Sequence, residues 1–426
     1  MTSRRYALIA VAVVLVVAAT TAAIVAGTSS STDSPGRVVG PRNNNTSSTE
    51  MPSSTTTTLP RKPQVLVAWT GPVEHLFFHT LVIHPELAFR NNERAQGFRD
   101  YFVTVDEFKR ILIAMDHRHW SLVDIHDAVN GTVKVPAGRR PFVLSIDDVN
   151  YYTDDQPVGL AWRLALDQHN DVKAEERDAS GVHYTNNDII PMVDNFVAQH
   201  PDFSAGGAKG LIALTGYEGL FGERTQSGVP AGERAANIVR ARRLASRLKA
   251  TGWTFASHSY GHIDLVKKST GYIAADTKKW KDETESIIGP TDVYVYAFGA
   301  TPDLKSEKIR LIHSFGFSIQ CGIDGVARLV HINGVTYMAR RHIDGIGFAQ
   351  QTQRLSIFFN VDTVIDRAAR GLPPLSTTTT APPTPTSTIT PTSTIALTPT
   401  TESEADSSTM PIPTTSTIVP RSLPQP

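Results

Sequence analysis

The stretch PFVLSIDDVNYY, from Pro141 to Tyr152, decides the fold that this sequence predicts. An apolar run ends in two adjacent carboxylates, Asp147 and Asp148, which is typical of a buried strand whose carboxyl end opens into a cleft. In α/β folds the reactive side chains lie at that end of the sheet. Because neighbouring residues of a strand point to opposite sides, the two aspartates can serve two different functions. A turn or a helix cap is the alternative for such a pair.

Apolar strands and amphipathic helices alternate from residue 64 to residue 372. Repeated strand–helix units predict a largely parallel sheet covered by helices, and about 310 residues is in the range of an α/β barrel. The predicted strands span residues 63–69, 75–83, 141–148, 210–217, 253–259, 292–299, 316–323 and 335–343. The predicted helices span residues 103–120, 188–203, 232–252, 277–289, 305–317 and 352–370, the first with Phe108, Ile111, Leu112 and Met115 on one face. Residues 152–189 fit no such unit, and we interpret them as an insertion beside the active face.

Both ends of the chain differ in composition from this domain. Arg4 and Arg5 precede an apolar stretch from Tyr6 to about Gly27 that is long enough to span a bilayer. We therefore expect a transmembrane anchor in residues 1–27, with a cleavable signal peptide as the alternative. Residues 28–63 are predicted to be a Ser/Thr/Pro-rich linker, and residues 373–426 a Thr/Pro/Ser-rich disordered tail. The domain is then extracytoplasmic, either attached to the cell membrane by a single pass or secreted.

Charge and cysteine content exclude several classes of function. Basic and acidic side chains balance at 41 each, so the overall charge does not indicate a nucleic-acid partner. The single cysteine, Cys321, excludes an internal disulfide and a cysteine-based zinc cluster.

A second polar group follows the strand predicted at 253–259, in the sequence HSYGH. The four-residue spacing of His258 and His262 would put both imidazoles on one face of a helical turn, an arrangement that zinc sites use. A pair of surface histidines is the alternative. Because both the aspartates and the histidines follow an apolar strand, we expect them to meet at the same edge of the sheet.

Three motifs in this order resemble the polysaccharide deacetylases of the NodB-homology type, carbohydrate esterase family four. SIDDV at 145–149 resembles the first family motif, TFDDG, and HSYGH matches the second, H-[ST]-x-x-H. YAFG at 296–299 is a reduced form of the third, which has an Arg-x-Pro-Tyr core. The likeness covers roughly residues 65–370 and implies a deformed (β/α) barrel.

The resemblance also implies a site. Asp148, His258 and His262 would hold a divalent metal, most simply Zn²⁺, and a water on that metal would attack the acetamide carbonyl with Asp147 as base. The backbone N–H of Phe298 would help to hold the oxyanion.

This sequence departs from the family pattern at several positions. Val149 stands in place of the glycine of the first motif, and Val295 and Ala297 stand in place of the arginine and proline of the third. In the family that arginine orients the base, and Arg341 is our candidate to replace it. His342 is the first candidate for the histidine that protonates the leaving group.

Other residues take secondary parts in this hypothesis. His331 is a weaker candidate for the acid, and we expect His79 to line the cleft or to satisfy a core contact rather than to bind metal. Tyr151, Tyr152, Tyr217 and Trp253 are candidates to shape a sugar-binding groove, with simple packing as the alternative.

The leading hypothesis is a metal-dependent hydrolase that removes N-acetyl or O-acetyl groups from a cell-envelope polysaccharide, such as peptidoglycan or poly-N-acetylglucosamine. One alternative is a wall-polysaccharide-binding relative with weak or no activity, because the arginine of the third motif is missing. The other is a C–N hydrolase acting on a small amide. The sequence does not predict an oligomeric state.

Overall fold

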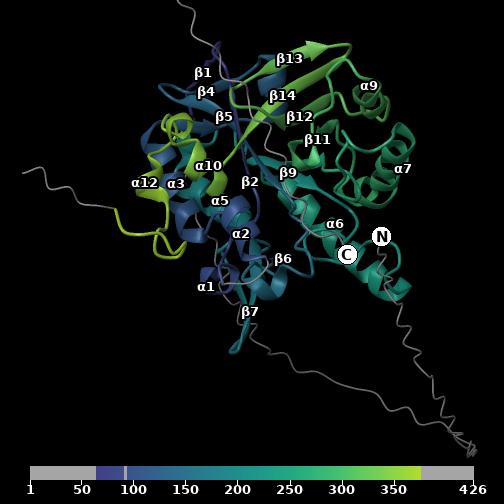
Figure 1. Cartoon of the computed structure of the whole chain (residues 1–426), viewed down its shortest axis with the longest axis horizontal. Helices are drawn as coiled ribbons and strands as arrows, with labels where there is room; N and C mark the ends of the chain where they lie inside the picture. Colours follow the sequence, from purple (N-terminus) through teal and green to yellow (C-terminus); the bar gives the residue numbers. More distant parts are fainter. Residues whose placement is uncertain (1–63, 91–93, 376–426) are drawn as a thin grey trace, which may run out of the picture. The chain divides into compact units, whose positions relative to one another are not determined.

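Seven parallel strands close into a barrel in the computed structural model of the chain, which describes residues 64–90 and 94–375 (Figure 1). Their order around the barrel is their order in the sequence, and the last strand pairs with both the first and the sixth. The strands are β2 (Glu74–Phe78), β5 (Arg140–Asp147), β9 (Gly210–Leu214), β10 (Trp253–Ser257), β11 (Val293–Val295), β12 (Ile319–Ile323) and β14 (Val335–His342). The predicted (β/α) barrel is thus confirmed, and it is deformed in having seven strands where the regular barrel has eight.

The remaining strands lie outside the barrel. Strand β3 (Trp120–Leu122) pairs in parallel with β5, and β13 (Leu329–Ile332) forms an antiparallel hairpin with β14. Strand β1 (Leu66–Ala68) pairs with β4 (Lys134–Pro136), and neighbouring Trp69 and Val73 pack on the same apolar cluster as barrel residues such as Val143 and Val293. Only Leu66–Ala68 of the stretch predicted at 63–69 forms a strand, and this strand is not part of the barrel.

Helices cover the outside of the barrel, and local sequence explains where they begin and end. Helix α3 (Val105–His117) starts with a capping box between Thr104 and Glu107 and buries the four predicted apolar residues. Helix α5 (Ile189–Gln199) is capped by Asp188. The long α6 (Ala231–Ala250) is followed by Gly252, whose φ of +101° a residue with a side chain rarely adopts. The other helices are α1 (Pro85–Ala88), α2 (Ala95–Tyr101), α4 (Ile125–Asn130), α7 (Thr270–Trp280), α8 (Ser286–Ile288), α9 (Glu307–Ser314), α10 (Gly345–Gln350), α11 (Thr352–Leu355) and α12 (Val361–Val364).

Most predicted elements are shorter in the structure, and three of them need a larger correction. The helix predicted at 352–370 is two short helices, α11 and α12, because the Asn360 side chain accepts the N–H of Asp362 and starts a new helix there. The helix predicted at 277–289 begins earlier, as α7, and passes through a π-helical turn at Lys281–Glu285 before α8. The strand predicted at 75–83 ends at Phe78.

The insertion at 152–189 contains a small antiparallel sheet of its own. It consists of β6 (Arg163–Leu166), β7 (Val172–Asp178) and β8 (Gly181–Thr185), with β7 in the middle. Buried Glu175 of β7 pairs with Arg163 and Arg177, and Arg163 also pairs with Glu223 before α6. In Figure 1 this sheet lies at the lower edge of the described part.

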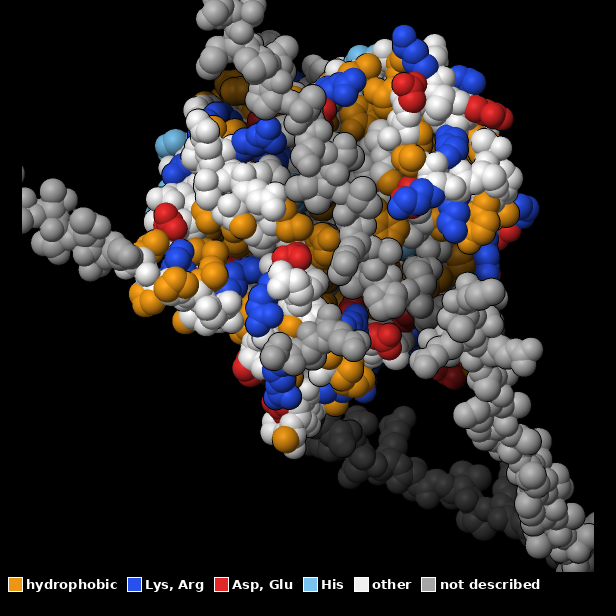
Figure 2. Space-filling model, viewed as in Figure 1, with side chains coloured by type: hydrophobic (Ala, Val, Ile, Leu, Met, Phe, Trp, Pro, Cys, Tyr) orange, Lys and Arg blue, Asp and Glu red, His pale blue; other side chains and the backbone are white. Residues whose placement is uncertain are grey.

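Within residues 64–90 and 94–375, no helix is long and apolar enough to cross a membrane. The anchor predicted at 1–27, the linker at 28–63 and residues 376–426 of the predicted tail lie outside the described residues. Basic and acidic side chains are interspersed on the face shown in Figure 2, and no patch of a single sign dominates it.

A histidine between two carboxylates makes stability depend on pH. His126 of α4 bonds to Asp124 through Nδ1 at 2.9 Å and to Asp292 before β11 through Nε2 at 2.8 Å. These two hydrogen bonds raise the pKa of His126 to about 10. A raised folded-state pKa gives stability that is complete below the unfolded-state pKa of about 6.5 and is lost as the pH rises towards 10.

We expect His126→Gln to lower the free energy of unfolding by about 1 kcal/mol at pH 6, a small value because solvent screens this half-exposed pair. The difference from the unsubstituted protein should vanish above pH 10. Urea unfolding at several pH values measures it. A difference that does not change with pH would contradict the proposed ion pairing.

Candidate active site

The predicted polar residues meet at the carboxyl end of the barrel. Asp147 is the last residue of β5 and Asp148 the next, while His258 directly follows β10. Strand β9 lies between β5 and β10, and the N–H of His258 donates to the carbonyl of Leu214 at the end of β9. The barrel therefore brings together two stretches that are more than a hundred residues apart in the sequence.

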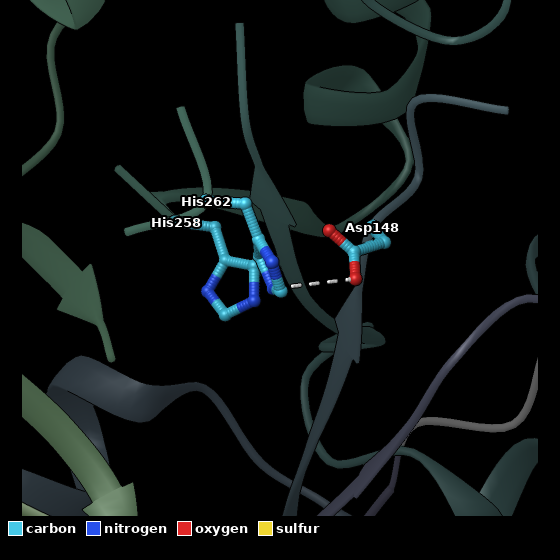
Figure 3. A group of neighbouring side chains, drawn as sticks. All are labelled: Asp148, His258 and His262. Carbon is cyan, nitrogen blue, oxygen red and sulfur yellow. Dashed lines mark ion pairs between the residues drawn. The ribbon is translucent and has the colours of Figure 1, made fainter. Parts of the chain in front are cut away.

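Asp148, His258 and His262 form a group that can hold a metal ion (Figure 3). One ligand atom from each residue lies within 4.8 Å of the other two, and Asp148 Oδ2 is 3.7 Å from His262 Nε2. Ligand atoms that share one zinc ion in tetrahedral geometry lie about 3.4 Å apart, so a small inward movement suffices. The Nδ1–H of His258 donates to the Val295 carbonyl at 3.0 Å, which leaves Nε2 with a lone pair for a metal. The donor set and its orientation fit a divalent ion.

Burial and charge keep these ligands in the form that binds metal. Burial lowers the pKa of His262 to about 4, although the Asp148 carboxylate opposes this effect. Burial alone would raise the pKa of Asp148, but the charges of His262 and His258 lower it below its usual value. Above about pH 5 we therefore expect a neutral imidazole and an ionised carboxylate, the states that bind a metal.

The two histidines do not lie on a helical turn, which corrects the predicted local geometry. Residues 258–262 form a loop in which Ser259 and His262 have φ angles of +62° and +50°. Asp148 and Phe298 likewise have φ of +59°. Such conformations are unfavourable for residues with side chains, by about 1 kcal/mol or more each, and they cluster where function requires them. The two histidines come together with Asp148 as expected, but through this loop and not through a helical turn.

A tyrosine supports the carboxylate of Asp148. The hydroxyl of Tyr152 donates to Asp148 Oδ1 at 2.6 Å and lies 2.8 Å from Thr215 Oγ1. Its ring stacks on Tyr217 at 5.0 Å. Tyr152 and Tyr217 therefore border the site, whereas Tyr151 and Trp253 are buried and bond to Asp188 and Asp194, so they cannot line a groove.

Asp147 lies inside the barrel and is paired with an arginine that the sequence reasoning missed. Arg340 of β14 donates to both carboxylate oxygens of Asp147, at 2.7 and 3.0 Å, and is 1% exposed. Burial favours a protonated Asp147, but the charge and hydrogen bonds of Arg340, together with nearby His258, outweigh it and hold the pKa at about 2. The Arg340 guanidinium also lies over the ring of Phe77, 4.2 Å from its centroid. Asp147 is thus an ionised carboxylate in a fixed orientation.

The pair continues into a chain of buried polar groups. Arg340 also donates to Ser145 Oγ at 3.2 Å, and this hydroxyl lies 3.0 Å from His75 Nε2. Burial lowers the pKa of His75 well below its usual value, so this histidine is neutral. The chain joins inward side chains of β14, β5 and β2 across the barrel.

Arg341, the predicted partner of Asp147, points the other way. Its guanidinium donates to Glu74 at 3.1 Å and lies over the ring of Phe358. Neighbouring residues of β14 face opposite sides of the strand, so only Arg340 enters the barrel. The prediction chose the right strand and the wrong one of two adjacent arginines.

The histidines considered as the acid occupy different places. His342 Nδ1 bonds to Asp344 at 2.9 Å and its Nε2 contacts Gln351, while exposed His331 of β13 bonds to Thr336. His79 directly follows β2, and its ring packs against those of Phe77 and Phe102. That His79 lines the cleft stays a prediction. Its Nδ1–H donates to the carbonyl of Tyr101 at 3.0 Å.

Phe298 contributes its ring to the border of the site. The ring centroid lies 4.3 Å from that of His262, and the side chain is 51% exposed. Phe298 is therefore a large apolar side chain that is exposed, has a strained backbone and lies next to a candidate metal ligand. Side chains of this kind are common at binding surfaces. The predicted oxyanion role of its N–H stays a prediction.

Comparisons with known proteins assign no family to this chain. No family model matches the chain, and no curated protein matches it. Similar solved structures include a Streptococcus pyogenes deacetylase, PplD, in complex with acetate, at 14% identity and a TM-score of 0.38, over 66% of this chain and 94% of that one. A de-N-acetylase from Aggregatibacter actinomycetemcomitans has 14% identity and a TM-score of 0.40, over 67% and 100% of the two chains. IcaB from Ammonifex degensii has 12% identity and a TM-score of 0.38, over 66% and 95%.

The first two of these proteins are deacetylases by name. Identities of 12–14% and TM-scores of 0.38–0.40 are too low to transfer an activity. The side chains of the site therefore carry the functional proposal.

Proposed function

We propose that this chain is a metal-dependent hydrolase that removes acetyl groups from the acetamido sugars of a polysaccharide. The observation that carries the proposal is the group Asp148, His258 and His262 next to the Asp147–Arg340 pair, at the carboxyl end of a parallel barrel. It combines a place for a Lewis acid with a carboxylate that is not needed as a ligand.

Asp148, His258 and His262 would hold the metal, and zinc suits two imidazole nitrogens and one carboxylate. When bound, such an ion polarises the acetyl carbonyl and lowers the pKa of a water ligand towards about 7.

Asp147 would accept the proton of the attacking water. It is ionised at any physiological pH because Arg340, with a smaller contribution from His258, keeps its pKa at about 2 despite burial. Its Oδ2 lies 3.8 Å from His258 Nε2, so the carboxylate borders the group of Asp148, His258 and His262, which does not include it. The bidentate Arg340 contact fixes the plane of the carboxylate, and such fixed positions reduce the reorganisation that catalysis requires.

We assign proton donation to the leaving amine to His79 in place of His342. Both nitrogens of His342 have protein partners, whereas His79 uses Nδ1 for Tyr101 and leaves Nε2 for exchange. In one turnover Asp147 gains the proton taken from water, and His79 loses the proton given to the amine. Passage of a proton from Asp147 to His79 then restores both residues. The N–H of Phe298 remains our proposal for the oxyanion donor.

The polymer that we propose as substrate is a cell-envelope glycan containing N-acetylglucosamine, acted on outside the cytoplasmic membrane. Two features support a sugar ligand: the Tyr152–Tyr217 pair on one side of the metal group and the exposed ring of Phe298 on another. Aromatic rings of this kind pack against the apolar faces of sugars. The alternative of an inactive binding protein rested on the missing arginine of the third motif, and Arg340 now weakens it.

Acetate release tests the proposal. The purified full-length chain should release acetate from N-acetylglucosamine oligomers, lose this activity when a chelator removes the metal, and regain it with added Zn²⁺. Acetate release that persists after complete metal removal would contradict a metal-dependent reaction. Oligomer binding without acetate release would favour the binding protein, and turnover of simple acetamides alone would favour a hydrolase of small amides.

A further inference from the structure

The second histidine of the metal group, His262, is not held by its own side chain. His258 extends a barrel strand and its ring donates to the Val295 carbonyl. Among the described residues, the ring of His262 forms no such hydrogen bond; it lies near the Asp148 carboxylate and against the rings of His258 and Phe298. Its position therefore depends on the backbone of the loop from residue 258 to residue 262.

One carboxylate outside this loop holds its backbone. Asp276 of α7 accepts the N–H of Tyr260 with Oδ1 and the N–H of Gly261 with Oδ2, both at 2.8 Å. The carbonyl of Tyr260 in turn accepts the N–H groups of Gly216 and Tyr217 from the loop after β9. A Cβ at residue 261 would lie 3.3 Å from Asp276 Oδ2, so glycine permits this close approach. The loop is thus held between α7 and the loop after β9.

Asp276 is costly to bury, which argues for a specific role. Only 9% of its surface is exposed, and no ion pair joins it to a lysine or arginine within the described part of the chain. A buried carboxylate without a salt-bridge partner is unfavourable unless hydrogen bonds compensate for lost solvation. Two charge-assisted bonds from the loop N–H groups provide that compensation. The same two bonds oppose the unfavourable backbone of Ser259 and His262 at φ of +62° and +50°.

We propose that Asp276 is a positioning residue that sets the affinity of the site for its metal by fixing the loop that carries His262. This inference rests on the metal site of the proposed function. The substitution Asp276→Asn would keep the size of the side chain, but the carboxamide would offer one acceptor and turn an N–H donor towards the other loop N–H. The loop would then shift, and His262 would bind less well.

The test measures zinc affinity by competition with a chromophoric chelator, for the full-length chain and for Asp276→Asn. We expect the dissociation constant to rise by about 10- to 100-fold, the range for changes behind metal ligands. The absorption spectrum of the Co²⁺ form should change as well, because it reports ligand geometry. Asp282→Asn is the matched control: this exposed residue follows α7 and pairs with Lys278, and its replacement should leave zinc affinity unchanged.

A purely structural role for Asp276 would lower the melting temperature of the metal-free protein without changing zinc affinity, and that result would overturn the proposal. Should Asp276→Asn fail to fold, Gly261→Ala perturbs the same contact from the loop side and should weaken zinc binding by a smaller factor; unchanged affinity there would also overturn it. A wild-type chain that binds no zinc would refute the metal site of the proposed function itself. Zinc binding by the wild type with equal affinity in Asp276→Asn would refute only the role of Asp276.

Discussion

Replacing Asp147 by asparagine should lower kcat for acetate release by about a thousandfold while the metal stays bound, because a carboxamide cannot accept the proton of the attacking water. Asp147 lies beside the metal group and outside it, so the bound zinc should equal that of the unsubstituted chain. Acetate release and metal content, measured on the same preparation, check both parts of this expectation.

Asp148→Asn is the comparison for this experiment. The two aspartates are adjacent, yet the second should fail by losing the metal, since Asp148 is one of three ligands. Retention of activity in Asp147→Asn would show that the base lies elsewhere, and loss of metal would make Asp147 a ligand. The Asp147 variant also leaves Arg340 buried without its partner, so activity should be measured well below its melting temperature.

The barrel could be predicted because its signal is repeated. Each strand is a short apolar run followed by a helix with an apolar face, and right-handed parallel connections leave few arrangements for such a series. Asp148 and His258 follow two of these strands, so the barrel places them at one end whatever the details of the loops. The sequence therefore predicts that Asp148 and His258 lie close together, although it gives no distances.

The choice between Arg340 and Arg341 could not be made from the sequence. Strand β14 is buried on both sides, and its residues before the arginines, Met338 and Ala339, are both apolar and both buried. Where a strand alternates between polar and apolar residues, the pattern reveals which side chains point inwards. A parallel barrel strand lacks that alternation, and a shift of one residue exchanges every inward and outward side chain.

The conformation of the loops at the site could not be predicted from the sequence either. His262 and Phe298 reach the site through positive φ angles that no propensity favours for these residue types. The hydrogen bonds that hold such loops come from distant parts of the chain, as from Asp276 to Gly261. A likeness to family motifs can indicate which residues matter, but it does not supply the contacts that hold them.

Replacing Arg340 by methionine should have a large effect on both stability and activity. Methionine fills most of the volume but leaves Asp147 buried without a positive partner, and removing one member of a buried pair costs about 3–5 kcal/mol. Burial would then raise the pKa of Asp147, where the arginine now holds it at about 2. A carboxylate whose pKa is lower in the folded protein than its unfolded value of about 3.8 stabilises the fold at pH values above 3.8. Arg340→Met would remove this contribution, and the loss would be measurable at neutral pH. Urea unfolding and the pH profile of kcat measure the two effects.

The double variant Asp147→Asn with Arg340→Met separates a pairwise effect from general damage. If the loss of stability comes from an uncompensated charge, the double variant should be more stable than Arg340→Met alone, because the buried charge is gone. If the losses of stability in the two single variants simply add in the double variant, the explanation by an uncompensated charge is contradicted. Arg341→Met is the matched neighbour: it breaks the pair with Glu74 on the outer side of β14 and should leave the pH profile of acetate release unchanged. A shifted profile in Arg341→Met would mean that the field of the outer arginine also reaches the base, and that the orientation of β14 alone does not determine the basicity of Asp147.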